Sequence, residues 1–371
     1  MAQVHRPALP RFINAAYYPA NWLADGQLNG RLNYACINVV FVAFASLKPD
    51  GTVFLEHPVS GLDLDPERNH TVSSFVELRD QNRHLRLVLS IGGSDGSSNF
   101  AAVAADEAKR RRFACSAEDL VYRCAFEGID VDWEHPADRQ QGHNFILLLD
   151  EIRRRLPRGE YILTAALPAA RWALRHVNLG LAGHILDYLN LMAYDFVGPW
   201  STRAGHHAQL YSGYPGSAEE PCGAVAVSYS IQCGFPAQRL LLGIPAYGYF
   251  FRQMTLGGYA SPSQTRTYEY RDLLALSSRT THHMNKVAVS MSDEHGGFIT
   301  YDAPWSVRLK AEYCKTNGLG GLFYWHALGD VPSGWLSLIE AGHRELNWRV
   351  VPIGAPQPST NGYMNGVNGN H

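Results

Sequence analysis

The chain has 371 residues, of which 46% are hydrophobic and 18% charged, and its formal net charge is −2. This length allows two ordinary domains or one large domain, and the composition supports a buried core rather than a disordered chain. Nucleic-acid binders and binders of anionic membranes need a clustered basic excess, so the charge balance argues against both. No apolar leader follows the first methionine, and we therefore expect a cytoplasmic protein, or one exported by a non-standard route.

Eight segments have the composition of β-strands, because they are short, apolar and bounded by turn-forming residues. They are residues 12–18, 37–45, 86–91, 126–132, 161–166, 186–193, 240–246 and 320–325. Segments with apolar residues at helical spacing lie between them. This alternation predicts a parallel sheet, and eight strands over this length predict an α/β fold with a single closed (β/α)8 TIM barrel. A doubly wound open sheet is the structural alternative.

The predicted barrel forms one catalytic domain over about residues 10–350. Its seventh and eighth strands are separated by more chain than one crossover helix needs, which indicates a short insertion at about 248–298. Residues 352–371 are rich in Gly, Asn and Pro and are predicted to be disordered. None of the six cysteines forms a CxxC pair, which favours reduced thiols, although pairing of Cys222 with Cys233 stays open.

Three carboxylates recur with period two at the fourth predicted strand, at Asp130, Asp132 and Glu134. On a strand they point to one side, about 6.6 Å apart from one to the next. Apolar Ile129 and Val131 occupy the alternate positions, so the acids should face the barrel interior. Like charges at this spacing raise at least one pKa, as a general acid requires near neutral pH. The last acid falls at the carboxyl end of the strand, where barrel active sites are built.

This segment, FEGIDVDWEHP at 126–136, resembles the D-G-x-D-x-D-x-E signature of glycoside hydrolase family 18, the chitinases. Glu127 stands where the signature has its first Asp, and the other signature positions match. Three further segments resemble the family's motifs on the third, sixth and eighth strands, namely LSIGG at 89–93, LMAYDF at 191–196 and GGLFYW at 320–325. The resemblance therefore covers the whole predicted barrel.

The resemblance implies an endo-acting chitinase that retains anomeric configuration by substrate-assisted catalysis, in which the substrate's 2-acetamido oxygen is the nucleophile. Glu134 would be the general acid and then the general base. Asp132 would orient the acetamido N–H, Asp130 would share a proton with Asp132, and Tyr194 would donate to the acetamido oxygen. Six residues would line the sugar subsite: Trp325, Met192, Asp195, Tyr17, Phe44 and Tyr247.

Two positions depart from the family pattern. Ser94 stands where the family often has Trp, which puts an outer aromatic sugar platform in question. Tyr249 stands where an Arg often follows two residues after the Tyr at position 247, so that contact is in question unless Arg252 supplies it. The segment between strands seven and eight is also shorter than the insertion of deep-cleft members, which implies an open groove and internal cleavage.

Three alternatives remain at this level. One is an endo-β-N-acetylglucosaminidase acting on N-glycans. Another is a non-catalytic chitin-binding lectin, although such lectins typically lose the acid found here at Glu134. The third is a serine hydrolase, since GGSDG at 92–96 fits a nucleophile elbow but leaves the acidic strand unexplained.

The expected partner is chitin or a chitooligosaccharide, bound by a monomer without nucleic acid or membrane. The sixteen histidines include no H-E-x-x-H motif, and neighbours such as His206 and His207 cannot readily bind one ion together. We therefore expect neither a metal nor an organic cofactor.

Overall fold

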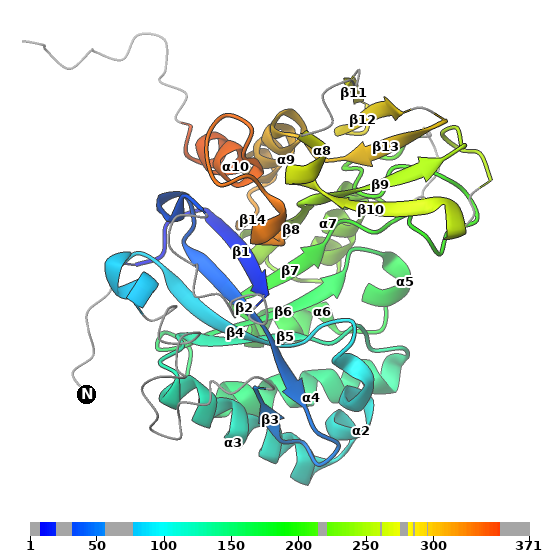
Figure 1. Ribbon diagram of the computed structural model, residues 1–371. Coiled ribbons are helices and arrows are strands. Elements are labelled where there is room, and N and C mark those ends of the chain that lie inside the picture. Colours follow the sequence, from blue (N-terminus) through cyan, green and yellow to red (C-terminus); the bar gives the residue numbers. More distant parts are fainter. Residues whose placement is uncertain are drawn as a thin grey trace, which may run out of the picture.

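The structure is a computed structural model that describes residues 8–19, 32–55, 77–213, 221–259, 262–274, 281–284, 286–294 and 296–348. Eight parallel strands form its central barrel (Figure 1): β1 (Ile13–Pro19), β2 (Val39–Leu47), β4 (Arg86–Gly92), β5 (Gly128–Asp132), β6 (Ile162–Pro168), β7 (Tyr188–Met192), β8 (Leu240–Pro245) and β14 (Gly321–Trp325). Strand β1 pairs in parallel with both β2 and β14, which closes the ring. The predicted TIM barrel is confirmed, and the open sheet is excluded.

Helices cover the outside of the barrel (Figure 1): α2 (Phe100–Ala105), α3 (Glu107–Arg123), α4 (Arg139–Arg155), α5 (Arg171–Leu174), α6 (Leu179–Ile185), α7 (Gly223–Gln232), α9 (Pro304–Thr316) and α10 (Leu338–Asn347). A short strand β3 (Val53–Phe54) runs antiparallel to β2. In β5, Ile129 and Val131 are fully buried in the apolar layer shared with the helices. This alternation turns the acids of the same strand toward the barrel interior, as expected.

The segment between β8 and β14 contains a second sheet. Five antiparallel strands pair in the order β10-β9-β13-β12-β11, with bounds β9 (Tyr247–Arg252), β10 (Thr265–Glu269), β11 (Thr281–Met284), β12 (Val289–Glu294) and β13 (Gly297–Tyr301). A short helix, α8 (Tyr270–Leu274), follows β10. The predicted excursion is thus organised as an α+β insertion. Because β9 starts two residues after β8 ends, the insertion stands at the carboxyl end of the barrel strands.

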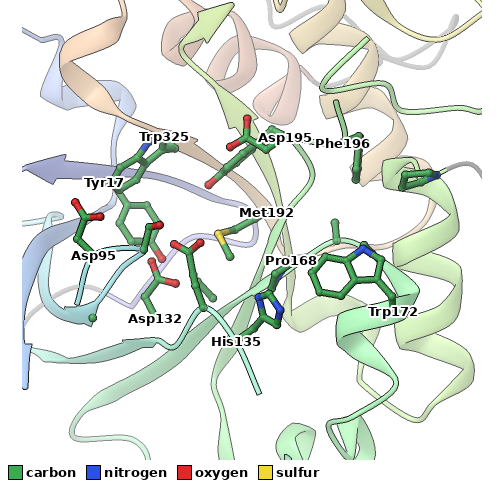
Figure 2. Close-up of a pocket in the computed structure, with 18 of the residues that line it drawn as sticks. Tyr17, Asp95, Asp132, His135, Pro168, Trp172, Met192, Asp195, Phe196 and Trp325 are labelled. Atoms are coloured by element: carbon green, nitrogen blue, oxygen red, sulfur yellow. The ribbon is translucent and has the colours of Figure 1, made fainter. Parts of the chain in front are cut away.

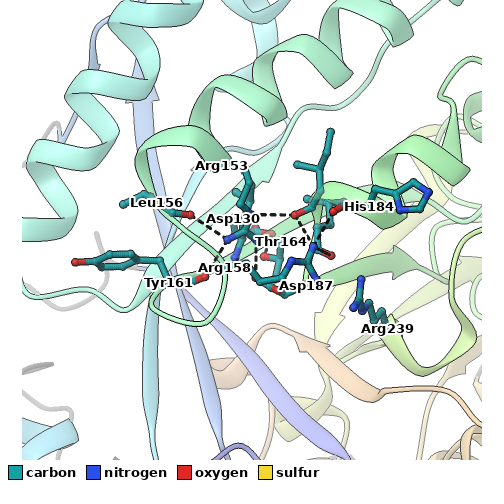
Figure 3. Close-up of polar contacts among 12 residues, drawn as sticks. Asp130, Arg153, Leu156, Arg158, Tyr161, Thr164, His184, Asp187 and Arg239 are labelled. Atoms are coloured by element: carbon teal, nitrogen blue, oxygen red, sulfur yellow. Dashed lines mark hydrogen bonds and ion pairs between the residues drawn. The ribbon is translucent and has the colours of Figure 1, made fainter. Parts of the chain in front are cut away.

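The opposite end of the barrel carries charges with a structural role. Arg153 of α4 donates to the Asp187 carboxylate (2.6 Å) and to the carbonyls of Leu156 and Tyr161 (3.0 and 3.1 Å), as Figure 3 shows. The same carboxylate accepts the Leu163 N–H (2.9 Å). This cluster secures the start of β6 and β7, at the face where barrel residues serve stability.

Three further points concern the cysteines, the lengths of the helices and the C-terminal tail. None of the six cysteines, all of which the structure describes, is in a disulfide, and Cys222 and Cys233 cap opposite ends of α7, roughly 16 Å apart along the helix axis. None of the described helices is long and apolar enough to cross a membrane. The tail predicted at 352–371 lies outside the described residues.

One buried ion pair ties the insertion to the outer helices. Lys310 of α9 is 2% exposed and bonds the carboxylate of Asp302, which follows β13, at 2.5 Å. The same ammonium donates to the Ala208 carbonyl at 2.7 Å. Burial lowers the pKa of Lys310, and the Asp302 charge opposes that shift. Lys310 therefore holds the loop around Ala208 against the barrel.

Lys310→Met should lower the free energy of unfolding by about 3–5 kcal/mol, because it leaves the Asp302 carboxylate buried without its partner. Urea denaturation measures this change. Lys315→Met, in the same helix, is the matched control: its pair with Glu345 is partly exposed and should contribute no more than about 1 kcal/mol. Equal losses in the two variants would contradict the role assigned to Lys310.

Candidate active site

A cavity of about 690 Å³ opens at the carboxyl ends of the barrel strands (Figure 2). Eight of the ten predicted site residues line it: Tyr17, Phe44, Asp132, Glu134, Met192, Tyr194, Asp195 and Trp325. The other two, Asp130 and Tyr247, lie behind this lining and contact residues that belong to it. The barrel therefore gathers into one site the residues that the sequence spreads over more than 300 positions.

Asp130 is fully buried at the centre of the barrel. Its Oδ2 accepts the hydroxyls of Tyr17 (2.9 Å) and Ser90 (2.7 Å), and its Oδ1 accepts the hydroxyl of Thr164 (2.5 Å). Burial raises the pKa of Asp130, and these hydroxyls oppose that shift. One carboxylate thus binds side chains from β1, β4 and β6 and fixes the floor beneath the next acid of the strand.

The next two acids, Asp132 and Glu134, have strongly raised pKa values. Burial, followed by the charges of Glu134 and Asp130, raises the pKa of Asp132 well above its usual range. Burial, followed by the charges of Asp195 and Asp95, raises the pKa of Glu134 to about 7. Glu134 therefore carries a proton near neutral pH, as a general acid must.

The two acids are also placed for different tasks. Asp132 is 3% exposed, and its Oδ1 has no hydrogen-bond partner among the described residues. A buried acceptor without a partner is costly, so it is suited to receive a donor from a ligand. Glu134 lies two residues beyond β5, and its N–H donates to the Ser97 hydroxyl (2.9 Å), which in turn donates to the Gly93 carbonyl (2.8 Å).

The LSIGG segment supports these acids through its backbone. Gly92 has φ +114°, and a Cβ there would lie 2.2 Å from the Asp132 carbonyl oxygen. Gly93 has φ +77°, and a Cβ there would lie 2.5 Å from the Phe44 ring. Side chains at either position would push β4 away from the acidic strand and its aromatic neighbour. Glu127, where the signature has Asp, accepts the Leu87 N–H (2.7 Å) at the start of β5, away from the cavity.

Asp195 connects the barrel to the insertion. It has a left-handed backbone, with φ +60°, and its Oδ1 accepts the hydroxyls of Tyr247 (2.6 Å) and Tyr249 (2.9 Å) from β9. Tyr249 therefore supplies a neutral donor at the position where the family often has an Arg. Arg252 does not replace that Arg, because it is exposed at the far end of β9.

Aromatic side chains form the floor and the walls of the cavity. Trp325 stacks on Phe44, with ring centroids 5.6 Å apart. Trp172 and Trp200, which the motifs did not identify, also line the cavity and are 52% and 61% exposed. Figure 2 shows Trp172 beside His135 and across the cavity from Trp325. Trp172 lies in the short helix α5 after β6, and Trp200 lies in the loop after β7. The signal available in the sequence was an aromatic residue soon after a strand end.

Asp95 is a second residue that the motifs did not assign. It lines the cavity in the loop after β4, and its charge contributes to the raised pKa of Glu134. Among the described residues that line the cavity, four are carboxylates and none is Lys or Arg. Among all described residues, no group of three or more His, Cys, Asp or Glu could hold a metal ion.

Asp95→Asn should move the basic limb of the pH–activity profile to lower pH. Removing this negative charge lowers the pKa of Glu134 from about 7, so the acid loses its proton earlier as the pH rises. The limb is read between pH 4 and about 9 from kcat/KM on a chitooligosaccharide, the substrate that the sequence resemblance implies. Asp119→Asn removes the same charge from an exposed ion pair on α3 and should leave the limb in place. An unchanged limb in Asp95→Asn would contradict the assignment.

Comparisons with known proteins agree with this geometry. Residues 14–330 match the sequence model of the family "Glycosyl hydrolases family 18". Chitinase 1 of Aphanocladium album is 32% identical and is matched over 95% of this chain and 88% of that protein. Endochitinase 1 of Metarhizium robertsii is also 32% identical, over 86% and 82%. The crystal structure of a chitinase-like agglutinin from Robinia pseudoacacia superposes with a TM-score of 0.77 at 25% identity, covering 90% of this chain and 99% of that one.

Proposed function

Because the chain belongs to glycosyl hydrolase family 18, we propose that it is an endo-acting chitinase that cleaves β-1,4-linked N-acetylglucosamine polymers or oligomers with retention of configuration. The observation that carries the proposal is the pair formed by Glu134, with a pKa of about 7, and buried Asp132, with an unpartnered Oδ1, in one cavity. A proton donor beside an acceptor for an amide is what substrate-assisted glycoside hydrolysis requires.

In the first step, Glu134 gives its proton to the glycosidic oxygen while the bond from that oxygen to the anomeric carbon breaks. The acetamido carbonyl oxygen of the same sugar forms the new bond to the anomeric carbon and gives an oxazolinium ion. Asp132 Oδ1 accepts the acetamido N–H and stabilises the positive charge, and the Tyr194 hydroxyl donates to the acetamido oxygen. In the second step, Glu134 takes a proton from water, which attacks the anomeric carbon from the face that the leaving group left. The bond from the acetamido oxygen to that carbon breaks, and the acetamido group is restored.

Internal cleavage is supported by the aromatic surfaces on both sides of the acids. Trp325 and exposed Trp172 lie across the cavity from each other, and exposed Trp200 also lines it. A sugar chain in contact with both sides would pass the acids and be cut within its length. Of the two relatives, the Metarhizium protein carries the name endochitinase.

The test is hydrolysis of chitohexaose and of a soluble chitin derivative by the full chain. We expect early products of several lengths, a fall in viscosity that precedes most of the release of reducing ends, and first-formed β-anomers by NMR. Products that consist from the start of dimers alone would contradict the endo mode. First-formed α-anomers would contradict retention.

A binding protein is the second candidate, because the agglutinin shares the fold. Glu134 argues for catalysis, since a lectin needs no acid with a pKa near neutrality. Binding of chitooligosaccharide without hydrolysis between pH 5 and about 8 would favour the lectin. Release of high-mannose glycan from a denatured glycoprotein would instead point to an endo-β-N-acetylglucosaminidase.

A further inference from the structure

Asp195 lies at the edge of the cavity with an uneven set of partners. Its Oδ1 accepts two tyrosine hydroxyls from β9, and both are neutral groups. Its side chain is 39% exposed. Two negative charges raise the pKa of Glu134, and that of Asp195 has the larger effect. The tyrosines orient the Asp195 carboxylate without supplying the positive charge that an Arg would bring.

A buried histidine faces the same oxygen. His207 is fully buried, and its Nδ1 lies 3.6 Å from Asp195 Oδ1. Its ring packs against Tyr247 and Tyr249, with centroids 5.2 and 4.8 Å apart. Neither ring nitrogen has a hydrogen-bond partner among the described residues. Buried polar groups are rarely left without partners, so this arrangement needs a reason.

We propose that His207 is a positioning residue, whose Nδ1–H holds the Asp195 carboxylate and offsets its charge beside the general acid. A separation of 3.6 Å is longer than a hydrogen bond, but active-site hydrogen bonds often tighten only when substrate is bound. The role requires that the ring proton be on Nδ1. No other described residue forms a hydrogen bond with that atom. This proposal rests on the proposed function, because the general acid it tunes is that of the hydrolase.

The surroundings of His207 favour this role over simple packing. In the part of the chain that the structure describes, the titratable groups that face it are Asp195, Tyr247, Tyr249 and its neighbour His206. Burial, followed by the proximity of His207, lowers the pKa of His206 to about 4, so His206 is neutral at working pH. Among the described residues, Asp195 is therefore the negative group beside the ring.

The loop that carries His207 is held at several points. The Phe196 N–H donates to the His207 carbonyl at 3.0 Å, and the ammonium of Lys310 bonds the next residue, Ala208. His206 Nδ1 lies 3.1 Å from the Thr300 hydroxyl on β13. Because the backbone on each side is secured, the imidazole is presented to Asp195 in a fixed place.

The test compares His207→Leu with His207→Asn. The leucine variant lacks a donor, and we expect kcat on a chitooligosaccharide to fall about tenfold with little change in KM. Asp195 would then act on Glu134 without compensation, so the basic limb of the pH profile should move to higher pH by about half a unit. The side-chain amide of asparagine can place an N–H near the position of Nδ1, and it should recover most of kcat.

His206→Gln is the matched control, because His206 is the neighbouring buried imidazole and bonds Thr300 rather than Asp195. It should change stability and leave the pH profile in place. If His207→Leu and His206→Gln behave alike, or if asparagine recovers nothing relative to leucine, the positioning role is wrong.

NMR of the wild-type protein labelled with ¹⁵N-histidine tests whether His207 Nδ1–H contacts the Asp195 carboxylate. This test does not depend on whether the leucine variant folds. We expect a slowly exchanging Nδ1 proton for His207 that is lost in His207→Asn and shifted in Asp195→Asn. An unprotonated Nδ1 would overturn the proposal. Absence of hydrolysis by the wild type would instead refute the proposed function, and the NMR result would still show whether His207 holds Asp195.

Discussion

Glu134→Gln should reduce hydrolysis of a fluorogenic chitooligosaccharide at least 10²–10⁴-fold, the range typical of general acid–base catalysis. Glutamine keeps the size and the hydrogen-bonding capacity of the acid but cannot transfer a proton to the leaving oxygen. The wild-type rate should fall as the pH rises through about 7, because the pKa of Glu134 lies there and only the protonated acid is active.

Circular dichroism at matched concentration should show that the Glu134→Gln variant is folded, and it should still bind the oligosaccharide. Glu107→Gln, the same change in an exposed ion pair on α3, serves as the control and should keep full activity. Equal hydrolysis by wild type and Glu134→Gln would mean that the acidic strand has another purpose.

Asp132→Asn is the second change for which we expect a large effect, a loss of about 10²-fold or more in kcat. The Asp132 carboxylate is proposed to accept the acetamido N–H and to stabilise the oxazolinium charge, and a neutral amide does the second task poorly. Steady-state kinetics at the wild-type pH optimum measures the loss, and Asp119→Asn on α3 is the exposed control.

The stability of Asp132→Asn separates this role from a folding defect. Burial and neighbouring charges raise the pKa of Asp132 in the folded protein, so ionising it at neutral pH destabilises the native state relative to the unfolded chain. The asparagine variant should therefore have an equal or higher Tm at pH 7–8, and this gain should vanish only as the pH falls below about 4, where Asp132 is protonated in the unfolded chain as well. A lower Tm together with lost activity would mean that Asp132 supports the fold.

The barrel could be predicted from the sequence because its signals are local. Each parallel strand is covered on both faces and therefore reads as an apolar run, and each acid of the fourth strand alternates with an apolar neighbour such as Ile129. The observed strand ends lie within two residues of the predicted ones. The motifs ended at strand ends, so the residues they carried, such as Trp325, fell in the cavity.

The residues beyond the strand ends could not be placed in the same way. Trp172 in α5 and Trp200 in the loop after β7 reach the cavity because of the path that the chain takes after each strand, and no local period encodes that path. The partners of Asp195 come from β9, more than 50 positions away, and the register of an antiparallel sheet depends on pairings that sequence spacing does not reveal. In the sequence, nothing local distinguishes His207 from the other histidines. The fold places it beside the Asp195 carboxylate.

The position of β9 also bears on how this enzyme could diversify or be redesigned. The strand begins where the barrel's β8 ends, and it supplies the two hydroxyls that orient Asp195. An exchange of the insertion between relatives therefore also exchanges two partners of an acid that lines the cavity, whatever it does to the shape of the groove. A chimaera that keeps the parental loop with His207 but takes a β9 bearing an Arg would bring a fixed cation and an imidazole to one carboxylate. Insertion and loop are best transplanted as a single module.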